Sequence, residues 1–284
     1  MVAPAAVGLG LFVAAPFFLA VILSVTSLRL GSPLPVRWVG LDQFRDVLFD
    51  DTFRHALWNN ASFAIVVVPV QTTLALLVAV LLNRKLYGVV FFRSLFFLPL
   101  VFPMALVAVV WELIYAPGGS APLNSMLTSI TFGAWQPQSF LHHETLAWPA
   151  IMVLSIWQGM GFQMVLLLAG LQSIPRRLYE AAAIDGAGHL RRFFHITLPG
   201  LRNPLIFVVL VTSILAFRVF DQVQILTQGG PQDSTTTVIY ETYTAAFDRL
   251  QIGRACAMTV IFFLTVLMIT TIARVLMRQQ GDVA

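Results

Sequence analysis

Six long apolar stretches constrain this chain more than any other feature of its sequence. A helix needs about 20 residues to cross roughly 30 Å of hydrocarbon, and each stretch is long enough. With 58% hydrophobic and 11% charged residues, the chain carries more apolar surface than a soluble core could bury. We predict an all-α integral membrane protein, a single domain over residues 1–284, with six transmembrane helices: Pro4–Leu28, Ala61–Leu82, Phe91–Tyr115, Leu146–Leu171, Leu205–Leu226 and Ala255–Met277.

The first stretch admits a second interpretation, a secretory signal peptide. No Lys or Arg precedes this stretch and no clear small-residue cleavage site follows it, so a true span is favoured. The lack of a charged segment before the first span leaves the position of the native start open.

The Lys and Arg residues in the loops predict which side of the membrane each loop faces. Because cytoplasmic loops carry an excess of these residues, a balance of ten against six puts both termini and the fourth loop in the cytoplasm. The first, third and fifth loops then face outward. The ten are Arg84, Lys85, Arg93, Arg176, Arg177, Arg191, Arg192, Arg202, Arg274 and Arg278, and the six are Arg29, Arg37, Arg45, Arg54, Arg249 and Arg254.

The fourth loop, about residues 172–202, holds the most informative pattern in the chain. Pro175 suits the first turn of a helix, and the alanine-rich run 179–184 forms a helix readily. Gly186 then permits a tight turn, and a second short helix with an apolar face follows and ends at Pro199. Because helices this short are not stable alone, we expect the loop to need a partner surface.

The spacing in this loop resembles the signature of permeases in binding-protein-dependent ABC importers. The signature consists of Glu-Ala-Ala, three residues, Gly, nine residues, Ile, one residue and Leu-Pro, and every fixed position is present. In that family the loop forms coupling helices that dock into a cleft on a separate ATPase subunit. The resemblance implies a type I importer fold in a prokaryotic plasma (inner) membrane, with the coupling residues Glu180, Ala181, Ala182, Asp185, Gly186, Ile196, Leu198 and Pro199.

Residues 168–179 and 220–231 are similar to the sugar-type branch of that family, and in particular to the first permease of a pair. That branch includes permeases for maltose-like oligosaccharides and for glycerol 3-phosphate or its diesters. The resemblance therefore implies that the substrate is a carbohydrate or a related polyol: an oligosaccharide, an amino sugar, or a glycerol phosphate or glycerophosphodiester.

The same resemblance implies the partners of the chain. They are a second permease subunit that completes a heterodimer, an ATPase homodimer, and an extracytoplasmic substrate-binding protein or lipoprotein, all within or beside membrane lipids. Contacts with the binding protein are expected at the outer loop residues Gln228, Gly229, Gly230 and Pro231.

Polar residues within the predicted spans are candidates for the substrate path. Arg218 and Asp221 would each cost about 2.5–3.5 kcal/mol in a lipid-facing helix, and a spacing of three puts them on one helix face. They form either a pair that neutralises itself or a polar wall of the path. Trp157 either packs in the bundle or covers the apolar face of a sugar beside amides that bond its hydroxyls. The candidates are Trp157, Gln158, Gln163, Arg218, Asp221 and Gln222.

No pattern in the sequence points to catalysis by this chain. A phosphate-binding Gly-x-x-x-x-Gly-Lys-Ser/Thr loop is absent, and so are His-Glu-x-x-His and triad spacings. The single cysteine, Cys256, lies in the last span and suits a small hydrophobic packing role. We predict no catalytic residue, no metal site, no nucleic-acid binding and no cofactor in this chain, with ATP and Mg bound by the partner ATPase.

Two other functions are compatible with six spans. An autonomous secondary transporter of a polar solute would usually show internal repeats with broken helices in matching positions, and the sequence shows no such repeat. A membrane scaffold would need no docking signature. The signature in the fourth loop favours the ATP-driven importer over both alternatives.

Overall fold

A computed structural model describes residues 3–83 and 87–279 of the chain, and Arg84 and Lys85 of the orientation count lie outside them. Within the described part, the backbone is helical or irregular apart from one β-bridge, between Thr26 and Trp38. Five helices there are long and apolar enough to cross a membrane, and a bent helix pair makes a sixth. The all-α prediction is confirmed.

Four of the predicted spans are present with shifted ends. The second begins well before the predicted Ala61, because the Asp50 carboxylate caps the helix and accepts a hydrogen bond from the Phe53 N–H at 2.8 Å. The N-terminal helix consists of α1 (Ala3–Leu9), the π-helical turn η1 (Gly10–Ala14) and α2 (Ala15–Ser24), and the others are α4 (Asp51–Leu82), α8 (Glu144–Ser173) and α15 (Ile252–Gln279).

The predicted continuous span Phe91–Tyr115 is wrong in shape. Two helices, α5 (Val89–Val101) and α6 (Met104–Ile114), meet at a bend of 100°. Pro103 lacks an N–H and forces the preceding residue, Phe102, into an extended backbone with ψ of 138°. The helix therefore breaks between them.

The fifth span is also interrupted. Helix α12 (Arg202–Phe217) ends before Arg218, and helix α13 (Asp221–Leu226) begins three residues later. The intervening backbone leaves the helical region, since Phe220 has φ of −142°. The predicted span Leu205–Leu226 is therefore present as Arg202–Leu226, but it consists of two helices joined by a short non-helical segment.

Shorter elements form the loops. The outer loops contain α3 (Asp42–Leu48), α7 (Pro122–Ile130), η2 (Phe140–His142), α14 (Val238–Tyr243) and η4 (Thr244–Asp248). The fourth loop contains α9 (Arg176–Ile184), α10 (His189–Arg192), η3 (Phe193–Thr197) and α11 (Leu198–Gly200).

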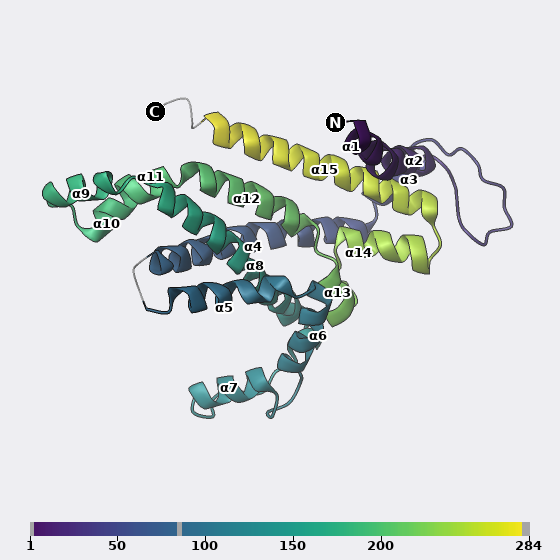
Figure 1. Cartoon of the computed structure of the whole chain (residues 1–284). Coiled ribbons are helices and arrows are strands. Elements are labelled where there is room, and N and C mark those ends of the chain that lie inside the picture. Colours follow the sequence, from purple (N-terminus) through teal and green to yellow (C-terminus); the bar gives the residue numbers. More distant parts are fainter. Residues whose placement is uncertain (1–2, 84–86, 280–284) are drawn as a thin grey trace.

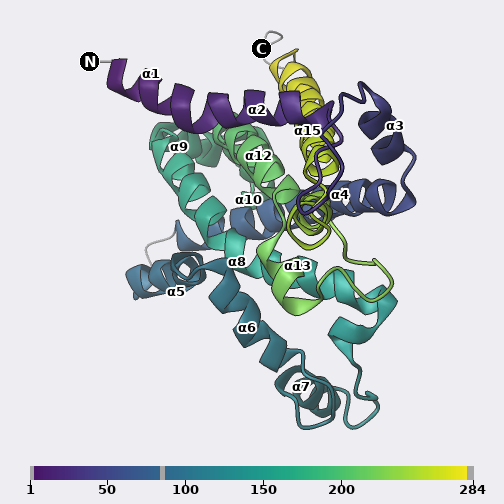
Figure 2. The same ribbon diagram turned by 90° about the vertical axis from the view of Figure 1, so that its right-hand side faces the viewer.

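The long helices place the fourth loop and the outer-loop helices α3 and α14 at opposite ends of a bundle. Figure 1 shows α9, α10 and α11 at the same end as the C-terminal end of α15, whereas α3 and α14 lie at the other end. The N-terminal helix lies across α15. In Figure 1 the N-terminal helix is seen nearly end-on while α15 is seen from the side, and in Figure 2 the N-terminal helix is seen from the side. Phe17 and Phe263 join the two helices, with ring centroids 4.6 Å apart.

Two apolar clusters hold the centre of the bundle. The first includes Phe63, Ile151 and Leu154 and lies where α4 and α8 meet α6 and α13. The second, which we call the coupling cluster, lies nearer to the fourth loop where α4, α8 and α12 meet. Its buried members are Ala75, Ala79, Leu82, Met164, Leu167, Leu168, Leu171, Ile174, Leu201 and Val208.

Candidate functional site

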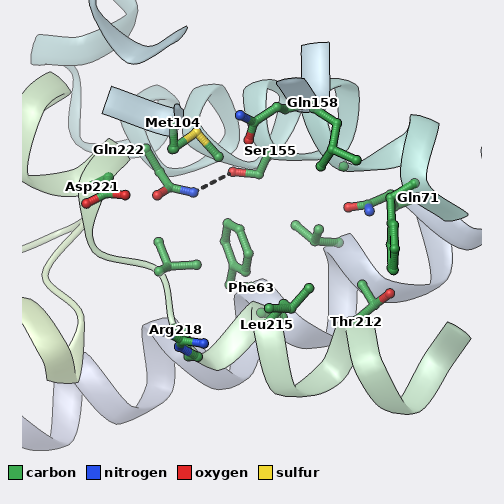
Figure 3. Close-up of a pocket in the computed structure, with 16 residues that line it drawn as sticks. Phe63, Gln71, Met104, Ser155, Gln158, Thr212, Leu215, Arg218, Asp221 and Gln222 are labelled. Carbon is green, nitrogen blue, oxygen red and sulfur yellow. Dashed lines mark hydrogen bonds between the residues drawn. The ribbon is translucent and has the colours of Figure 1, made fainter. Parts of the chain in front are cut away.

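A cavity of about 570 Å³ lies at the centre of the bundle, beside the interruption of the fifth span (Figure 3). Helices α4, α8 and α12 form most of its wall, and the α5–α6 bend and α13 complete it. Its lining residues are Phe63, Val67, Gln71, Leu100, Met104, Ser155, Gln158, Gly159, Phe162, Thr212, Leu215, Ala216, Arg218, Val219, Asp221 and Gln222.

Four of the six residues predicted for the substrate path line this cavity: Gln158, Arg218, Asp221 and Gln222. Gln222 is buried and donates from Nε2 to the Ser155 hydroxyl at 3.1 Å. Gln158 donates from Nε2 to the Phe102 carbonyl at 3.3 Å, so it also ties α8 to the α5–α6 bend. These amides are positioned by neighbouring helices and reach the cavity surface.

Arg218 and Asp221 do not form the predicted self-neutralising pair. Within the described residues, the ion pairs are Arg54–Asp51, Arg249–Glu241 and Arg254–Asp50, so neither Arg218 nor Asp221 takes part in one. The helix breaks between Arg218 and Asp221, so the spacing of three no longer puts them on one face. Both side chains are exposed and line the cavity at separate positions (Figure 3).

Trp157 and Gln163, which were also predicted for the substrate path, do not line the cavity. Trp157 is 42% exposed and packs against Trp111, with ring centroids 5.5 Å apart. Gln163 is fully buried and donates from Nε2 to the Thr212 hydroxyl at 2.6 Å. Gln163 therefore supports a cavity residue from behind, and Trp157 packs outside the cavity.

Sequence reasoning missed Gln71, Ser155 and Thr212, which also line the cavity. Gln71 lies flat against Gly159 on α8, where a Cβ atom would collide with the Gln71 amide nitrogen. Each of the three is a polar residue within a largely apolar stretch, which is a signal present in the sequence. Such a signal cannot separate hydroxyls that bond their own helix from those that face a cavity.

The cavity combines flat apolar rings with amides, hydroxyls and two opposite charges. Phe63 and Phe162 can cover the C–H faces of a sugar ring. The amides of Gln71, Gln158 and Gln222 offer both donors and acceptors to hydroxyl groups. This set of side chains suits a polyhydroxylated solute.

The fourth loop forms two short helical segments around a glycine turn. Gly186 has φ of 72°, in the left-handed region that favours glycine, as the sequence predicts for a tight turn. The Arg192 Nε donates to the Ala187 carbonyl at 2.6 Å and closes the turn. The Tyr179 and Thr197 hydroxyls are 3.0 Å apart and join the first segment to the second.

This loop exposes apolar side chains at one end of the bundle. Ile184 is 88% exposed, Leu190 77% and Phe194 57%. Among the predicted coupling residues, Ala182, Ile196 and Leu198 are half-buried, and Ile196 packs against the coupling cluster. The exposed ones are Glu180, Ala181, Asp185, Gly186 and Pro199.

The sequence predicted that the second segment would end at Pro199, and this prediction is wrong. Pro199 lies within a continuous helical path that runs from His189 through η3 to Gly200. Leu201, with ψ of 0°, separates α11 from α12.

The outer loop residues 228–231 fold back against the bundle. Gln228 is exposed, but Gly229 is buried and its carbonyl accepts a hydrogen bond from the Thr236 hydroxyl at 3.1 Å. The Tyr240 hydroxyl donates to the Gln228 carbonyl at 2.7 Å. Burial, and secondarily Asp248, raise the pKa of Tyr240 above its ordinary value. Of the predicted binding-protein contacts, Gln228 is the one most open to a partner.

Residues 71–281 match the family described as binding-protein-dependent transport system inner membrane component. The chain is 34% identical to the diacetylchitobiose uptake system permease protein NgcF of Streptomyces coelicolor, covering 95% of this chain and 79% of the relative. It is 31% identical to the sn-glycerol-3-phosphate transport system permease protein UgpA of Escherichia coli, covering 83% and 79%.

A solved structure of a bacterial ABC transporter that imports the acidic polysaccharide alginate has the same fold. The TM-score is 0.84 at 20% identity, covering 97% of this chain and 93% of the alginate transporter chain. A second alginate transporter structure, in complex with its alginate pentasaccharide-bound periplasmic protein, gives a TM-score of 0.86 at 19% identity, covering 98% and 93%. The helical fold, the signature loop and these matches lead to one conclusion: the chain belongs to the binding-protein-dependent ABC importer permeases and is a multi-pass inner membrane transport subunit.

Proposed function

We propose that this chain imports a carbohydrate or a related polyol, which crosses the membrane through the central cavity. The observation that carries the proposal is the lining of that cavity, which includes three glutamine amides, two hydroxyls and two phenylalanine rings. A sugar needs many donors and acceptors around an apolar ring face, and this wall supplies both. The diacetylchitobiose and glycerol-3-phosphate relatives support this substrate class.

A separate ATPase homodimer would dock on the fourth loop and supply the energy. The exposed Ile184, Leu190 and Phe194 offer an apolar surface, and Glu180 offers a charge beside it. ATP and Mg would bind that partner, because this chain carries no phosphate-binding loop. The loop and both termini would then lie in the cytoplasm, in agreement with the ten-to-six excess of basic residues.

The coupling cluster offers a route from the docked ATPase to the cavity. Tyr179 and Ile196 of the fourth loop pack against this cluster, which also contains Met164 of α8 and Val208 of α12. Packed apolar side chains move together rather than deform, so a displacement of the loop would shift α8 and α12. Both helices contribute to the cavity wall, at Gln158 and Thr212 respectively.

The remaining partners would complete the transporter. A second permease would form a heterodimer with this chain. An extracytoplasmic binding protein or lipoprotein would deliver the substrate to the outer loops, with Gln228 among its contacts.

Reconstitution tests the proposed function. The chain, its partner permease, its ATPase and its binding protein are placed in proteoliposomes, after the binding protein has been screened against oligosaccharides, amino sugars and glycerol phosphates. We expect uptake of the screened ligand that requires ATP on the ATPase side and the binding protein on the other. Uptake that follows an ion gradient without ATP would instead identify a secondary transporter, and no uptake of any solute would favour a scaffold.

A further inference from the structure

The interruption of the fifth span at residues 218–220 has no cause in the local sequence. Sharp breaks in helices usually occur at proline, at glycine, at a π-bulge, or where a side chain enters the hydrogen-bond ladder. The segment Phe217–Leu226 contains neither proline nor glycine. The cause must therefore lie in the residues that pack against it.

Two side chains from other parts of the chain donate hydrogen bonds to backbone carbonyls at the break. The Asn60 Nδ2 on α4 donates to the Phe217 carbonyl at 3.1 Å, and the Thr237 hydroxyl donates to the Val219 carbonyl at 2.9 Å. In a continuous helix these two carbonyls would accept from the N–H groups of Asp221 and Val223. Asn60 and Thr237 thus replace two of the backbone hydrogen bonds that a continuous helix would have.

Asn60 also joins the break to the outer loop. Its Oδ1 accepts a hydrogen bond from the Val238 N–H at 2.9 Å, at the start of α14. Asn60 and Thr237 are both 0% exposed, so water cannot take their place. Within a membrane protein, a freed carbonyl needs such an internal partner.

We propose that Asn60 is a positioning residue that keeps the fifth span broken, so that Arg218 and Asp221 face the cavity separately. In a continuous helix the two would lie three apart on one face and could pair with each other. In the broken form, both charges remain available to a solute in the cavity. The inference extends the proposed function, but it concerns the shape of the cavity wall and needs no particular substrate.

Asn59 provides a matched control next to Asn60 on the same helix. Its Nδ2 donates to the carbonyls of Asp233, Ser234 and Thr236, at 3.4, 3.2 and 2.9 Å. It is 4% exposed. Asn59 thus holds the outer loop without touching the broken end of α12.

Cysteine labelling of the full transporter complex tests the proposal. In a background that carries Cys256→Ala, a single cysteine is introduced by Asp221→Cys, at an exposed position, or by Val219→Cys, at a position that is 4% exposed. The rate of labelling by a water-soluble methanethiosulfonate reagent is measured for each cysteine, and the rate at position 221 is divided by the rate at position 219. Asn60→Leu should lower this ratio by about tenfold, since two buried backbone groups lose their partner and the continuous helix gains population.

The controls decide between a positioning role and a general loss of structure. Asn59→Leu should keep the wild-type labelling ratio, and Thr237→Val, nearly isosteric, should lower the ratio in the same direction as Asn60→Leu. An unchanged ratio in both Asn60→Leu and Thr237→Val would overturn the proposal. Failure of both variants to assemble, with Asn59→Leu assembling, would also overturn it, because the two residues would then hold the fold as a whole. Labelling requires neither ATP nor substrate, so a failure of the proposed function stays separate.

Discussion

Gly186 occupies the turn between α9 and α10 with φ of 72°, and no neighbouring atom lies within 4 Å of the place that a Cβ atom would take. A residue with a Cβ atom would fit into the space but not into the backbone conformation. Left-handed backbone costs L-residues about 1–2 kcal/mol, and more for β-branched ones. The turn therefore depends on glycine for its conformation alone.

Gly186→Val should weaken binding of the ATPase and reduce coupled uptake, because the two segments of the fourth loop would no longer meet at the same angle. Co-purification of the ATPase and uptake in proteoliposomes measure the effect. Gly188→Ala is the matched control, since Gly188 has φ of −69° and open space around it. A fully active Gly186→Val complex would show that this turn needs no special backbone.

Arg218 and Asp221 can be tested as a pair. Since they form no ion pair with each other in the described residues, replacing one does not leave the other without its partner. In a double-mutant cycle of Arg218→Leu and Asp221→Leu, thermal stability should give a coupling energy below about 0.5 kcal/mol. A coupling energy of several kcal/mol, with the double variant milder than either single one, would restore the self-neutralising pair.

At the scale of helices, close backbone contact sets how α5 packs on α8. A Cβ atom on Gly161 would collide with the carbonyl oxygen of Phe96. Small residues allow such close approach between membrane helices. Helix α5 leads from this contact to the α5–α6 bend, where Leu100 and Met104 line the cavity.

Gly161→Ala should destabilise the assembled transporter by about 1–3 kcal/mol, the usual cost of overpacking, although alanine favours helices. Thermal denaturation in detergent measures the change. Gly8→Ala in α1, where a Cβ atom meets open space, should leave the stability unchanged or slightly higher. Equal midpoints for the two variants would contradict the packing described for α5 and α8.

Which helices break could be predicted only where the cause is local. Proline does not decide alone, because Pro69 and Pro149 lie inside the continuous helices α4 and α8 while Pro103 accompanies a bend. The break after Phe217 has no local signal at all, since Asn60 is 157 residues away. By contrast, the fourth loop was predicted well, because Gly186 and the short helix before it act through their own backbone.

At the scale of the whole molecule, the cavity collects residues from segments that are distant in sequence. Intramembrane polarity predicted Gln158, Arg218, Asp221 and Gln222 in the site, but it could not separate Gln163, which supports Thr212, from Gln71, which faces the cavity. That difference depends on how α4, α8 and α12 rotate against one another. The coupling cluster then joins this cavity to the exposed fourth loop.

Glu180→Arg tests most directly the central claim that a separate ATPase drives this permease through the fourth loop. Glu180 is exposed on α9, so reversing its charge should leave the membrane bundle intact and change the docking surface. Asp46→Arg, the same reversal on the exposed face of α3 at the other end of the bundle, is the control. With Glu180→Arg, we expect the ATPase to co-purify weakly and ATP hydrolysis to lose its stimulation by the loaded binding protein, while the ATPase still co-purifies normally with Asp46→Arg. Normal co-purification and normal stimulation in Glu180→Arg would contradict the claim.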